Sequence, residues 1–189
     1  MWLCHLYSVY KENESKVKLP SFLCWRGAIG SATDLFIKLT RNKIMNELTS
    51  KQKGNLTELQ CITAFYKLGY SVSIPYGENS RYDFIADVNG DLIKVQVKTS
   101  RVKKENEAIV FTCRSTNVNT QGTTYHRYNK EQIDYFATFW NEKCYLIPVE
   151  ECSVEKTLRF CYPSNGQKKG ITLAEEYELE KVLNRRFDE

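Results

Sequence analysis

The decisive stretch of this chain runs from Tyr82 to Lys98 and reads YDFIADVNGDLIKVQVK. Two runs of alternating residues flank Asn89-Gly90, and this dipeptide between such runs is the strongest short-range signal of a two-residue β-hairpin turn. With that turn, Val88 pairs with Asp91, and every further pair follows by counting outward along both strands. The sequence therefore predicts an antiparallel strand pair whose register is set locally.

One face of the predicted hairpin carries polar side chains with useful chemistry. Counting outward places Asp83 opposite Gln96, and directly opposite residues have Cβ atoms about 4.5–5.5 Å apart. Lys98 lies two residues beyond Gln96 and therefore shares its face. A carboxylate, an amide oxygen and an ammonium group are thus expected side by side. The other face is apolar and suits a core, with Phe84, Ala86, Ile93, Val95 and Val97.

This grouping suits hydrolysis of a phosphodiester. A divalent cation such as Mg²⁺ takes oxygen ligands and keeps several waters, so Asp83 and Gln96 are candidate ligands. Such a metal lowers the pKa of a bound water and neutralises charge on the phosphate oxygens. Lys98 could orient the attacking water or stabilise the transition state. The plainer alternative is an exposed strand face on which these residues make ordinary cross-strand contacts.

A helix over roughly Lys51–Leu68 is predicted before the hairpin. Ser50 is the expected N-cap, and Gly69 occupies the position of a C′ glycine. Glu58 stands at the edge of the apolar stripe, where it could reach over the sheet as a further metal ligand or hold a metal-bound water. The stripe itself recurs at helical spacing, at Leu56, Leu59, Ile62, Phe65 and Tyr66.

The remaining pattern predicts a mixed sheet with helices packed on it. The core order is α-β-β-β-α-β, an α/β architecture. Residues 1–47 give no clear domain pattern and are interpreted as an N-terminal extension, with the functional domain at residues 48–189. Further strands are expected at Val72–Pro75, Ala108–Cys113, Cys144–Val149 and Leu158–Tyr162, and helices at Gln132–Trp140 and Ala174–Leu183.

These residues carry a family resemblance. Tyr82-Asp83 followed by Gln96-Val97-Lys98 resembles the D…(E/Q)xK signature of the PD-(D/E)XK nuclease superfamily. With the helix that carries Glu58, the similarity covers about residues 49–150 and points in particular to cyanobacterial group I intron homing endonucleases, whose core resembles that of archaeal Holliday-junction resolvases. The resemblance implies a restriction-endonuclease-like α/β fold with an αβββαβ core, in which helices flank a mixed central sheet.

The same resemblance implies roles for individual residues. Asp83 and Gln96 would be ligands of Mg²⁺ or Mn²⁺, Glu58 an accessory acidic residue at the metal, and Lys98 the catalytic lysine. Two positions depart from the family pattern, since Tyr82 replaces the proline and Gln96 replaces the usual acid. The second change removes one negative charge from the metal site, so it is expected to weaken metal binding.

Charge permits a nucleic-acid partner without demanding one. The chain has 27 Lys and Arg against 23 Asp and Glu, a formal net charge of +4. Basic residues supply phosphate affinity, and Asn, Gln and Arg can read base edges. Arg114–Tyr128 is predicted to be a long polar loop that either faces a DNA groove or forms a flexible surface connection. The candidate DNA-binding residues are Lys53, Arg81, Thr99, Ser100, Arg101, Lys103, Lys104, Arg114, Asn119, Gln121, His126 and Arg127.

Cysteine usage and hydropathy bear on the compartment. The chain has seven cysteines, no CxxC pair and two histidines, which argues against a structural zinc site and for free thiols in a reducing environment. No apolar run approaches the ~20 residues that a membrane span needs. We therefore expect a cytoplasmic protein with no membrane association, which joins the nucleoid when it binds DNA.

Three functions are compatible with these features. The first is a Mg²⁺-dependent endodeoxyribonuclease that cuts double-stranded DNA at a specific site, as homing enzymes do. The second is a structure-selective resolvase of four-way junctions, and the third is a catalytically inactive DNA-binding module that keeps the nuclease fold. Cutting both strands of a duplex generally needs two active sites, so the first reading implies a homodimer or a higher homo-oligomer.

Overall fold

The computed structural model describes residues 47–187, except for residues 78, 104–106 and 164–165. The N-terminal extension expected at residues 1–47 therefore lies, apart from Glu47, outside the described residues. Residues 48–189 form one compact unit, and the account below concerns that unit.

The first described helix, α3, spans Ser50–Lys67 and is closed at both ends by local contacts. Its N-cap is Thr49, whose side chain accepts from the Gln52 backbone while the Gln52 side chain accepts from the Thr49 backbone. The expected N-cap at Ser50 was wrong by one residue, because Thr49 and Gln52 have the spacing of a capping box. Gly69 has φ +86°, so the expected C′ glycine is confirmed.

The buried face of α3 differs from the apolar stripe that the sequence indicated. Thr57, Cys61 and Phe65, each four residues apart, are buried. Leu59 and Tyr66 are 60% and 58% exposed, so the apolar stripe is not the buried face of the helix at these two positions. The helix packs through its i, i+4, i+8 ridge, where the small Thr57 and Cys61 side chains allow close approach to the sheet.

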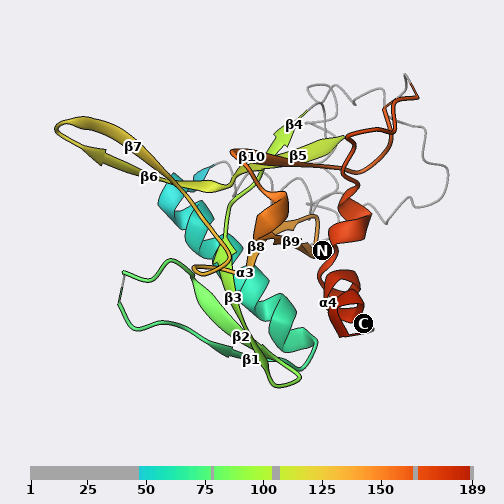
Figure 1. Cartoon of the computed structure of the whole chain (residues 1–189), viewed down its shortest axis with the longest axis horizontal. Coiled ribbons are helices and arrows are strands. Elements are labelled where there is room, and N and C mark those ends of the chain that lie inside the picture. The colour runs from blue at the N-terminus through green and yellow to red at the C-terminus, as the bar shows by residue number, and fades with distance from the viewer. Residues whose placement is uncertain (1–46, 78, 104–106, 164–165, 188–189) are drawn as a thin grey trace, which may run out of the picture. The chain divides into compact units, whose positions relative to one another are not determined.

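A mixed five-stranded sheet forms the centre of the unit (Figure 1), with strand order β1-β2-β3-β8-β9. Neighbouring strands are antiparallel except β3 and β8, which are parallel. The expected α/β class with a mixed central sheet is thus confirmed. The strands are β1 (Ser71–Ser73), β2 (Phe84–Val88), β3 (Asp91–Val97), β8 (Tyr135–Trp140) and β9 (Lys143–Pro148).

One predicted core helix, Gln132–Trp140, is wrong. Its place is taken by strand β8, which pairs with β3 on one side and β9 on the other. The YFATFW run is apolar except for the buried Thr138, and periodicity cannot separate a short buried helix from a buried strand. Aromatic and β-branched residues favour the strand.

The described chain between β3 and β8 is built from strands rather than from a crossover helix. Strands β4 and β5 join the late strand β10 in a three-stranded sheet of order β10-β5-β4. Strands β6 and β7 form a separate two-stranded hairpin, here called the ribbon. Their bounds are β4 (Arg101–Lys103), β5 (Ala108–Thr112), β6 (Arg114–Asn119), β7 (Gly122–Arg127) and β10 (Glu155–Arg159).

The C-terminal part of the unit follows the predicted order with shifted bounds. Strand β10 begins three residues earlier than expected. The predicted helix Ala174–Leu183 is divided into a 3-10 turn, η2 (Ala174–Tyr177), and helix α4 (Leu179–Phe187). A second 3-10 turn, η1 (Val149–Glu151), follows β9. No helix in the described part of the chain is long and apolar enough to cross a membrane.

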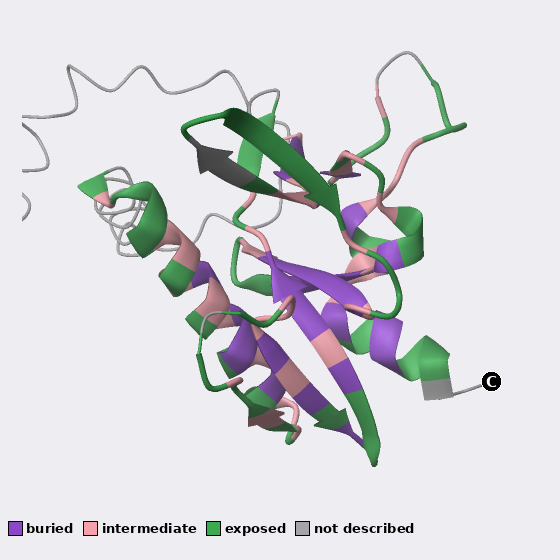
Figure 2. Ribbon diagram, turned by 60° about the vertical axis from the view of Figure 1, so that its left-hand side comes forward, coloured by how far each residue is buried: buried purple, intermediate pink, exposed green. Residues whose placement is uncertain are grey.

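Two hydrophobic clusters cover the two faces of the central sheet. Residues of α3 and α4, such as Phe65 and Leu183, pack with Val95 on one face. Residues of β5 and β10 pack with Phe136 and Ile147 on the other. Buried residues concentrate in the central strands, whereas the ribbon is exposed over most of its length (Figure 2). The central sheet that contains β3 therefore lies between two hydrophobic layers.

Candidate active site

The hairpin that carries the candidate residues has the expected register. Ladder pairs run from Val88–Asp91 at the turn to Phe84–Val95. Asn89 and Gly90 have φ +55° and +95°, as the type I′ turn requires at both central residues. The predicted register is therefore confirmed.

Asp83 and Gln96 contact each other directly, just beyond the last ladder pair. Asp83 donates its backbone N–H to Val95 at 2.9 Å, which extends the strand pairing by one residue. Gln96 Nε2 donates to Asp83 Oδ2 at 2.5 Å, and the Val97 backbone N–H donates to the same oxygen at 2.6 Å. The carboxylate is thus held through Oδ2, while Oδ1 takes part in neither bond.

Gln96 presents its amide nitrogen, not its oxygen, to Asp83. Nε2 also donates to the Val97 carbonyl at 3.3 Å, and the residue is only 8% exposed. Gln96 therefore steadies the acid, whereas a ligand role requires Oε1 to face the metal. A half-turn of the amide exchanges the two atoms without moving the rest of the side chain.

Glu58 reaches the site from α3. Its neighbour Thr57 lies on the buried ridge of the helix and contacts Thr99, just past β3, with 3.2 Å between the two hydroxyl oxygens. This contact brings the first half of α3 to the end of β3. Burial and then the charge of Asp83 raise the pKa of Glu58, so the two carboxylates lie within electrostatic reach.

The electrostatics of Asp83 favour a cation. Burial raises its pKa, against the opposing effects of the Val97 hydrogen bond, the Lys98 charge and the Gln96 hydrogen bond. Two partly buried carboxylates that disfavour their charged forms gain from a positive ion between them. Among the described residues, no group of three or more His, Cys, Asp or Glu side chains has an arrangement that could hold a metal ion. The oxygen donors expected at a metal, Asp83, Glu58 and the Gln96 amide, thus comprise two carboxylates and one amide.

Lys98 completes the group. Its backbone N–H donates to Ala137 of β8 at 2.9 Å, which fixes the residue at the end of β3. Its ammonium group is close enough to lower the pKa of Asp83, and Nζ lies 3.4 Å from the hydroxyl of Tyr128. The structure thus places Gln96 in contact with Asp83, and both Lys98 and Glu58 within electrostatic range of Asp83.

The segment Arg114–Tyr128 is not the loop that the sequence suggested. It forms the ribbon, in which Arg114 pairs with Arg127 and Asn119 with Gly122. All residues of β7 are exposed, and the ribbon projects from the body of the unit (Figure 1). The alternation of Thr, Tyr and Val on either side of Gly122 was the strand signal available in the sequence. Gly122 has φ +134° in the structure.

Several predicted DNA-binding residues lie on or beside this ribbon. Arg81 donates to Ser115 Oγ and to the Arg127 carbonyl at the base of the ribbon, at 3.1 and 3.4 Å. The guanidinium of Arg114 lies 4.0 Å from the ring centroid of Tyr125. Gln121, His126 and Arg127 are exposed, and Asn119 ends strand β6.

The other predicted DNA-binding residues follow β3 or lie on α3. Arg101 forms an exposed 2.6 Å ion pair with Glu155. Exposed ion pairs contribute little stability, so Arg101 can give up Glu155 for another anion at little cost. Lys103 is exposed on β4, while Ser100 buries its hydroxyl without a hydrogen-bond partner. Lys53 is half-buried on α3. Lys104 lies outside the described residues.

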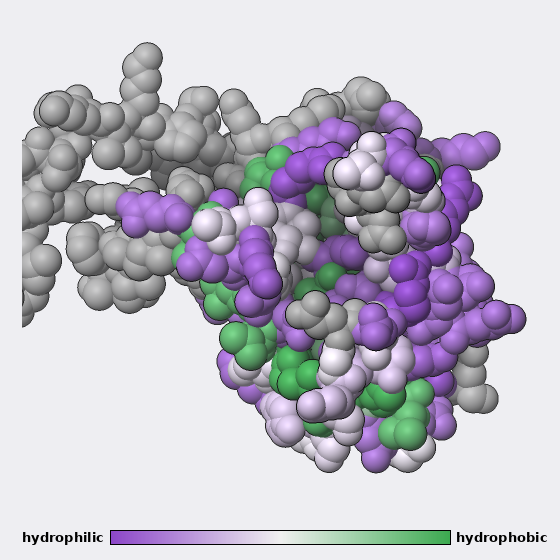
Figure 3. All heavy atoms as spheres, turned by 90° about the vertical axis from the view of Figure 1, so that its left-hand side faces the viewer, coloured by the Kyte–Doolittle hydropathy of each residue, from purple (hydrophilic) through white to green (hydrophobic). Residues whose placement is uncertain are grey.

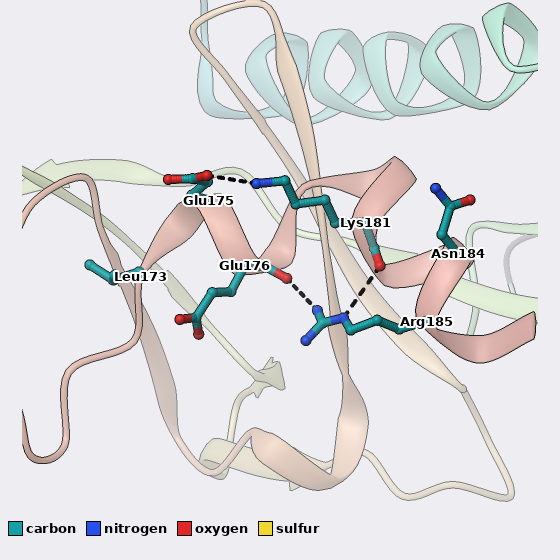
Figure 4. A pocket seen from close by; sticks show the side chains of 6 residues that line it. All are labelled: Leu173, Glu175, Glu176, Lys181, Asn184 and Arg185. Atoms are coloured by element: carbon teal, nitrogen blue, oxygen red, sulfur yellow. Dashed lines mark hydrogen bonds and ion pairs between the residues drawn. The ribbon is translucent and has the colours of Figure 1, made fainter. Parts of the chain in front are cut away.

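The face from which the ribbon projects is largely hydrophilic, with smaller apolar areas among the polar residues (Figure 3). A separate depression lies at η2 and α4 (Figure 4). Among its lining residues, Lys181 forms an ion pair with Glu175 at 2.7 Å, and Arg185 donates to the backbone carbonyl of Glu176. None of the four candidate catalytic residues lines it.

An acid and a lysine on the hairpin of a mixed sheet, with a glutamine at the position of the second acid and a glutamate on the preceding helix, resemble the site of the PD-(D/E)XK class of nucleases. Residues 48–180 match the sequence profile of the PD-(D/E)XK endonucleases, and this chain belongs to that family. Members of this class typically use divalent metal ions and act on DNA.

A solved structure supports the same assignment. The bacterial homing endonuclease I-Ssp6803I matches with a TM-score of 0.60 and 25% sequence identity, over 75% of this chain and 99% of that one. The restriction-endonuclease-like fold expected from the sequence is thereby confirmed. Comparison with curated proteins gives no match.

Proposed function

We propose that this chain is a divalent-metal-dependent DNA endonuclease that acts at a specific duplex site. The observation that carries the proposal is the convergence of Asp83, Gln96 and Lys98 at the end of β3, with Glu58 brought in by α3. This arrangement places two carboxylates and an ammonium group at one end of the sheet, which suits metal-assisted phosphodiester hydrolysis.

The residues have separate tasks in this reaction. Asp83 Oδ1, Glu58 and a turned Gln96 amide would hold Mg²⁺ or Mn²⁺. A metal held there would supply an activated water and would neutralise charge on the scissile phosphate. Lys98 places its positive charge beside the carboxylates, where it stabilises negative charge that develops on the phosphate oxygens in the transition state.

The ribbon supports recognition of a duplex. A two-stranded β-ribbon has dimensions that fit the DNA major groove, which carries a distinct pattern for each base pair. The exposed strand β7 offers Tyr125, His126 and Arg127 to such a groove. Arg81 and Arg114 stand at its base, where they suit phosphate contacts. We assign sequence readout to the ribbon and cleavage to the end of β3.

Nicking of supercoiled plasmid in Mg²⁺ or Mn²⁺ tests the proposal. Wild-type protein is expected to nick, with no activity in EDTA, and Asp83→Ala and Lys98→Ala are expected to abolish nicking. Asp91→Ala and Lys94→Ala are matched controls, since Asp91 lies at the far end of the hairpin and Lys94 Nζ bonds the Glu131 carbonyl. Both controls should retain activity.

Other outcomes point to the rival functions. If wild-type protein shifts duplex DNA in a gel but never cuts it with either metal, the chain is the inactive DNA-binding module. The Gln96–Asp83 hydrogen bond favours that function, because it occupies Asp83 without a metal. Preferential cutting of a synthetic four-way junction over a linear duplex identifies a resolvase. A homo-oligomer in light scattering, together with linear plasmid product, supports double-strand cutting by paired sites.

A further inference from the structure

Tyr128 lies between the ribbon and the candidate catalytic residues. It directly follows β7, and its ring meets Phe136 edge-on, with centroids 5.3 Å apart and planes at 84°. Phe136 is buried and stands beside Gln96 in the parallel β3–β8 register. The ring is therefore anchored to the central sheet at the level of the site.

Two cationic side chains gather at this ring. Lys98 Nζ donates to Tyr128 Oη at 3.4 Å and lies 5.2 Å from the ring centroid. The guanidinium carbon of Arg81 lies 4.2 Å from the same centroid. Cations within about 6 Å of an aromatic centroid are attracted by the negative ring face. The same ring thus holds Lys98 and the arginine that precedes Asp83 by two residues.

Arg81 also ties the ring to the ribbon. Nη1 donates to Ser115 Oγ on β6, and Nη2 donates to the Arg127 carbonyl on β7. One guanidinium therefore joins both strands at the ribbon base to Tyr128. A displacement of the ribbon on DNA acts on the ring through Arg81 and through the chain, because Tyr128 is the next residue after Arg127.

We propose that Tyr128 is a positioning residue that places the Lys98 ammonium for catalysis and makes its placement depend on the ribbon. The inference rests on the proposed nuclease function. A lysine ammonium sits on a flexible four-carbon stem, and the Tyr128 hydroxyl is an acceptor within reach of it. Loss of this partner releases the ammonium from its position without removing a charge that binds DNA, so the rate falls while affinity stays.

The test compares full-length variants in single-turnover nicking of supercoiled plasmid with Mg²⁺. Tyr128→Phe is expected to lower the saturating rate roughly tenfold, within the range that small displacements of reacting groups produce, and to leave the half-saturating protein concentration within a factor of about two. Tyr128→Leu also removes the ring that holds Arg81, so both the rate and the half-saturating concentration should worsen. Tyr128→His keeps a ring and an acceptor nitrogen, so it should recover part of the rate.

Tyr177→Phe is the matched control. Tyr177 packs in the same hydrophobic cluster, donates to Glu151 and has the Lys156 ammonium 4.9 Å from its ring centroid. It lies in η2, outside the candidate catalytic group, so its variant should nick at the wild-type rate. Thermal unfolding of each variant checks that the proteins are folded.

The outcomes separate this inference from the proposed function. A wild-type rate for folded Tyr128→Phe overturns the positioning role and leaves the nuclease intact. If the Phe variant does not fold, equal rates for Tyr128→His and Tyr128→Leu overturn the role instead. A wild-type protein that nicks nothing overturns both proposals.

Discussion

At the scale of single residues, the site depends on how Asp83 is held. Its Oδ2 accepts two short hydrogen bonds, from Gln96 and from the Val97 backbone. The glutamine makes the metal-free site stable, because an acid in its place would face a second carboxylate without a donor between them. The same glutamine gives the metal less negative charge, so stability without metal and affinity for metal are opposed at this position.

Gln96→Glu is expected to lower the stability of the metal-free protein and to raise its affinity for metal. In EDTA, loss of the donor and repulsion from Asp83 should lower the free energy of unfolding by about 1–3 kcal/mol. In excess Mg²⁺ most of this loss should be recovered, because the cation lies between the acids. Denaturant unfolding in EDTA and in Mg²⁺ measures both values. A loss that Mg²⁺ leaves unchanged would place the metal elsewhere.

The Asp83 carboxylate should also make the stability of the protein depend on pH. The pKa of Asp83 lies above its ordinary 3.8 in the metal-free protein, with burial as the main cause. A carboxyl group whose pKa is raised on folding binds more protons in the folded state, so its contribution to stability falls as pH rises from the ordinary pKa through the raised one. Asp83→Asn should therefore gain stability relative to wild type as pH rises through that window.

Thermal unfolding in EDTA, from about pH 3.5 to about pH 7, checks this slope. Asp91→Asn is the control, since Asp91 is exposed at the far end of the hairpin. A difference between Asp83→Asn and wild type that is constant across the range, or that falls with rising pH, contradicts the raised pKa.

At the scale of elements, the hairpin was the most predictable part of the fold. Asn89-Gly90 encodes its own turn, so the register of β2 and β3 and the shared face of Asp83, Gln96 and Lys98 followed from counting alone. The contact between Gln96 and Asp83 was predictable, but the direction of the amide was not, since it depends on the Val97 carbonyl beyond the pair.

Elements defined by long-range packing were less predictable. The run from Tyr135 to Trp140 is apolar except at Thr138 because both faces of β8 are covered, and this removes the periodicity that identifies a strand. The burial of Thr57 and the exposure of Leu59 on α3 depend on which ridge meets the sheet. Tyr128 was missed because its role arises from Arg81 and Lys98, which are distant in sequence.

Two glycine substitutions test the importance of the turn. Gly90 has φ +95°, so Gly90→Ala should lower the free energy of unfolding by about 1 kcal/mol. Gly54 lies inside α3 with open space around it, so Gly54→Ala should instead raise stability by about 0.5–1 kcal/mol. Urea unfolding of both variants gives the comparison, and changes of the same sign would contradict the assigned backbone conformations.

At the scale of the whole molecule, the nuclease family match and the compact unit occupy nearly the same residues. The match covers 48–180, and the compact unit covers 48–189. The unit has a hydrophobic cluster on each face of its sheet and contains all four candidate catalytic residues. We therefore propose that it is the nuclease domain and that residues 1–47 are an extension of it.

Met45–Glu189 produced alone should accordingly unfold in one cooperative transition and should nick plasmid in Mg²⁺. Calorimetry and the nicking assay measure the two properties. Loss of folding would show that the residues before Met45 belong to the domain. Intact folding with lost nicking would assign them a part in binding DNA or in assembly.

The central claim is that the end of β3 seats a divalent ion between Asp83 and Glu58. Anomalous diffraction from crystals soaked in Mn²⁺ tests it most directly. The account predicts a manganese peak bonded to oxygens of Asp83 and Glu58, with the Gln96 amide turned to present Oε1. A nicking-competent protein whose manganese lies elsewhere, with Asp83 still bonded only to Gln96 and Val97, would contradict it.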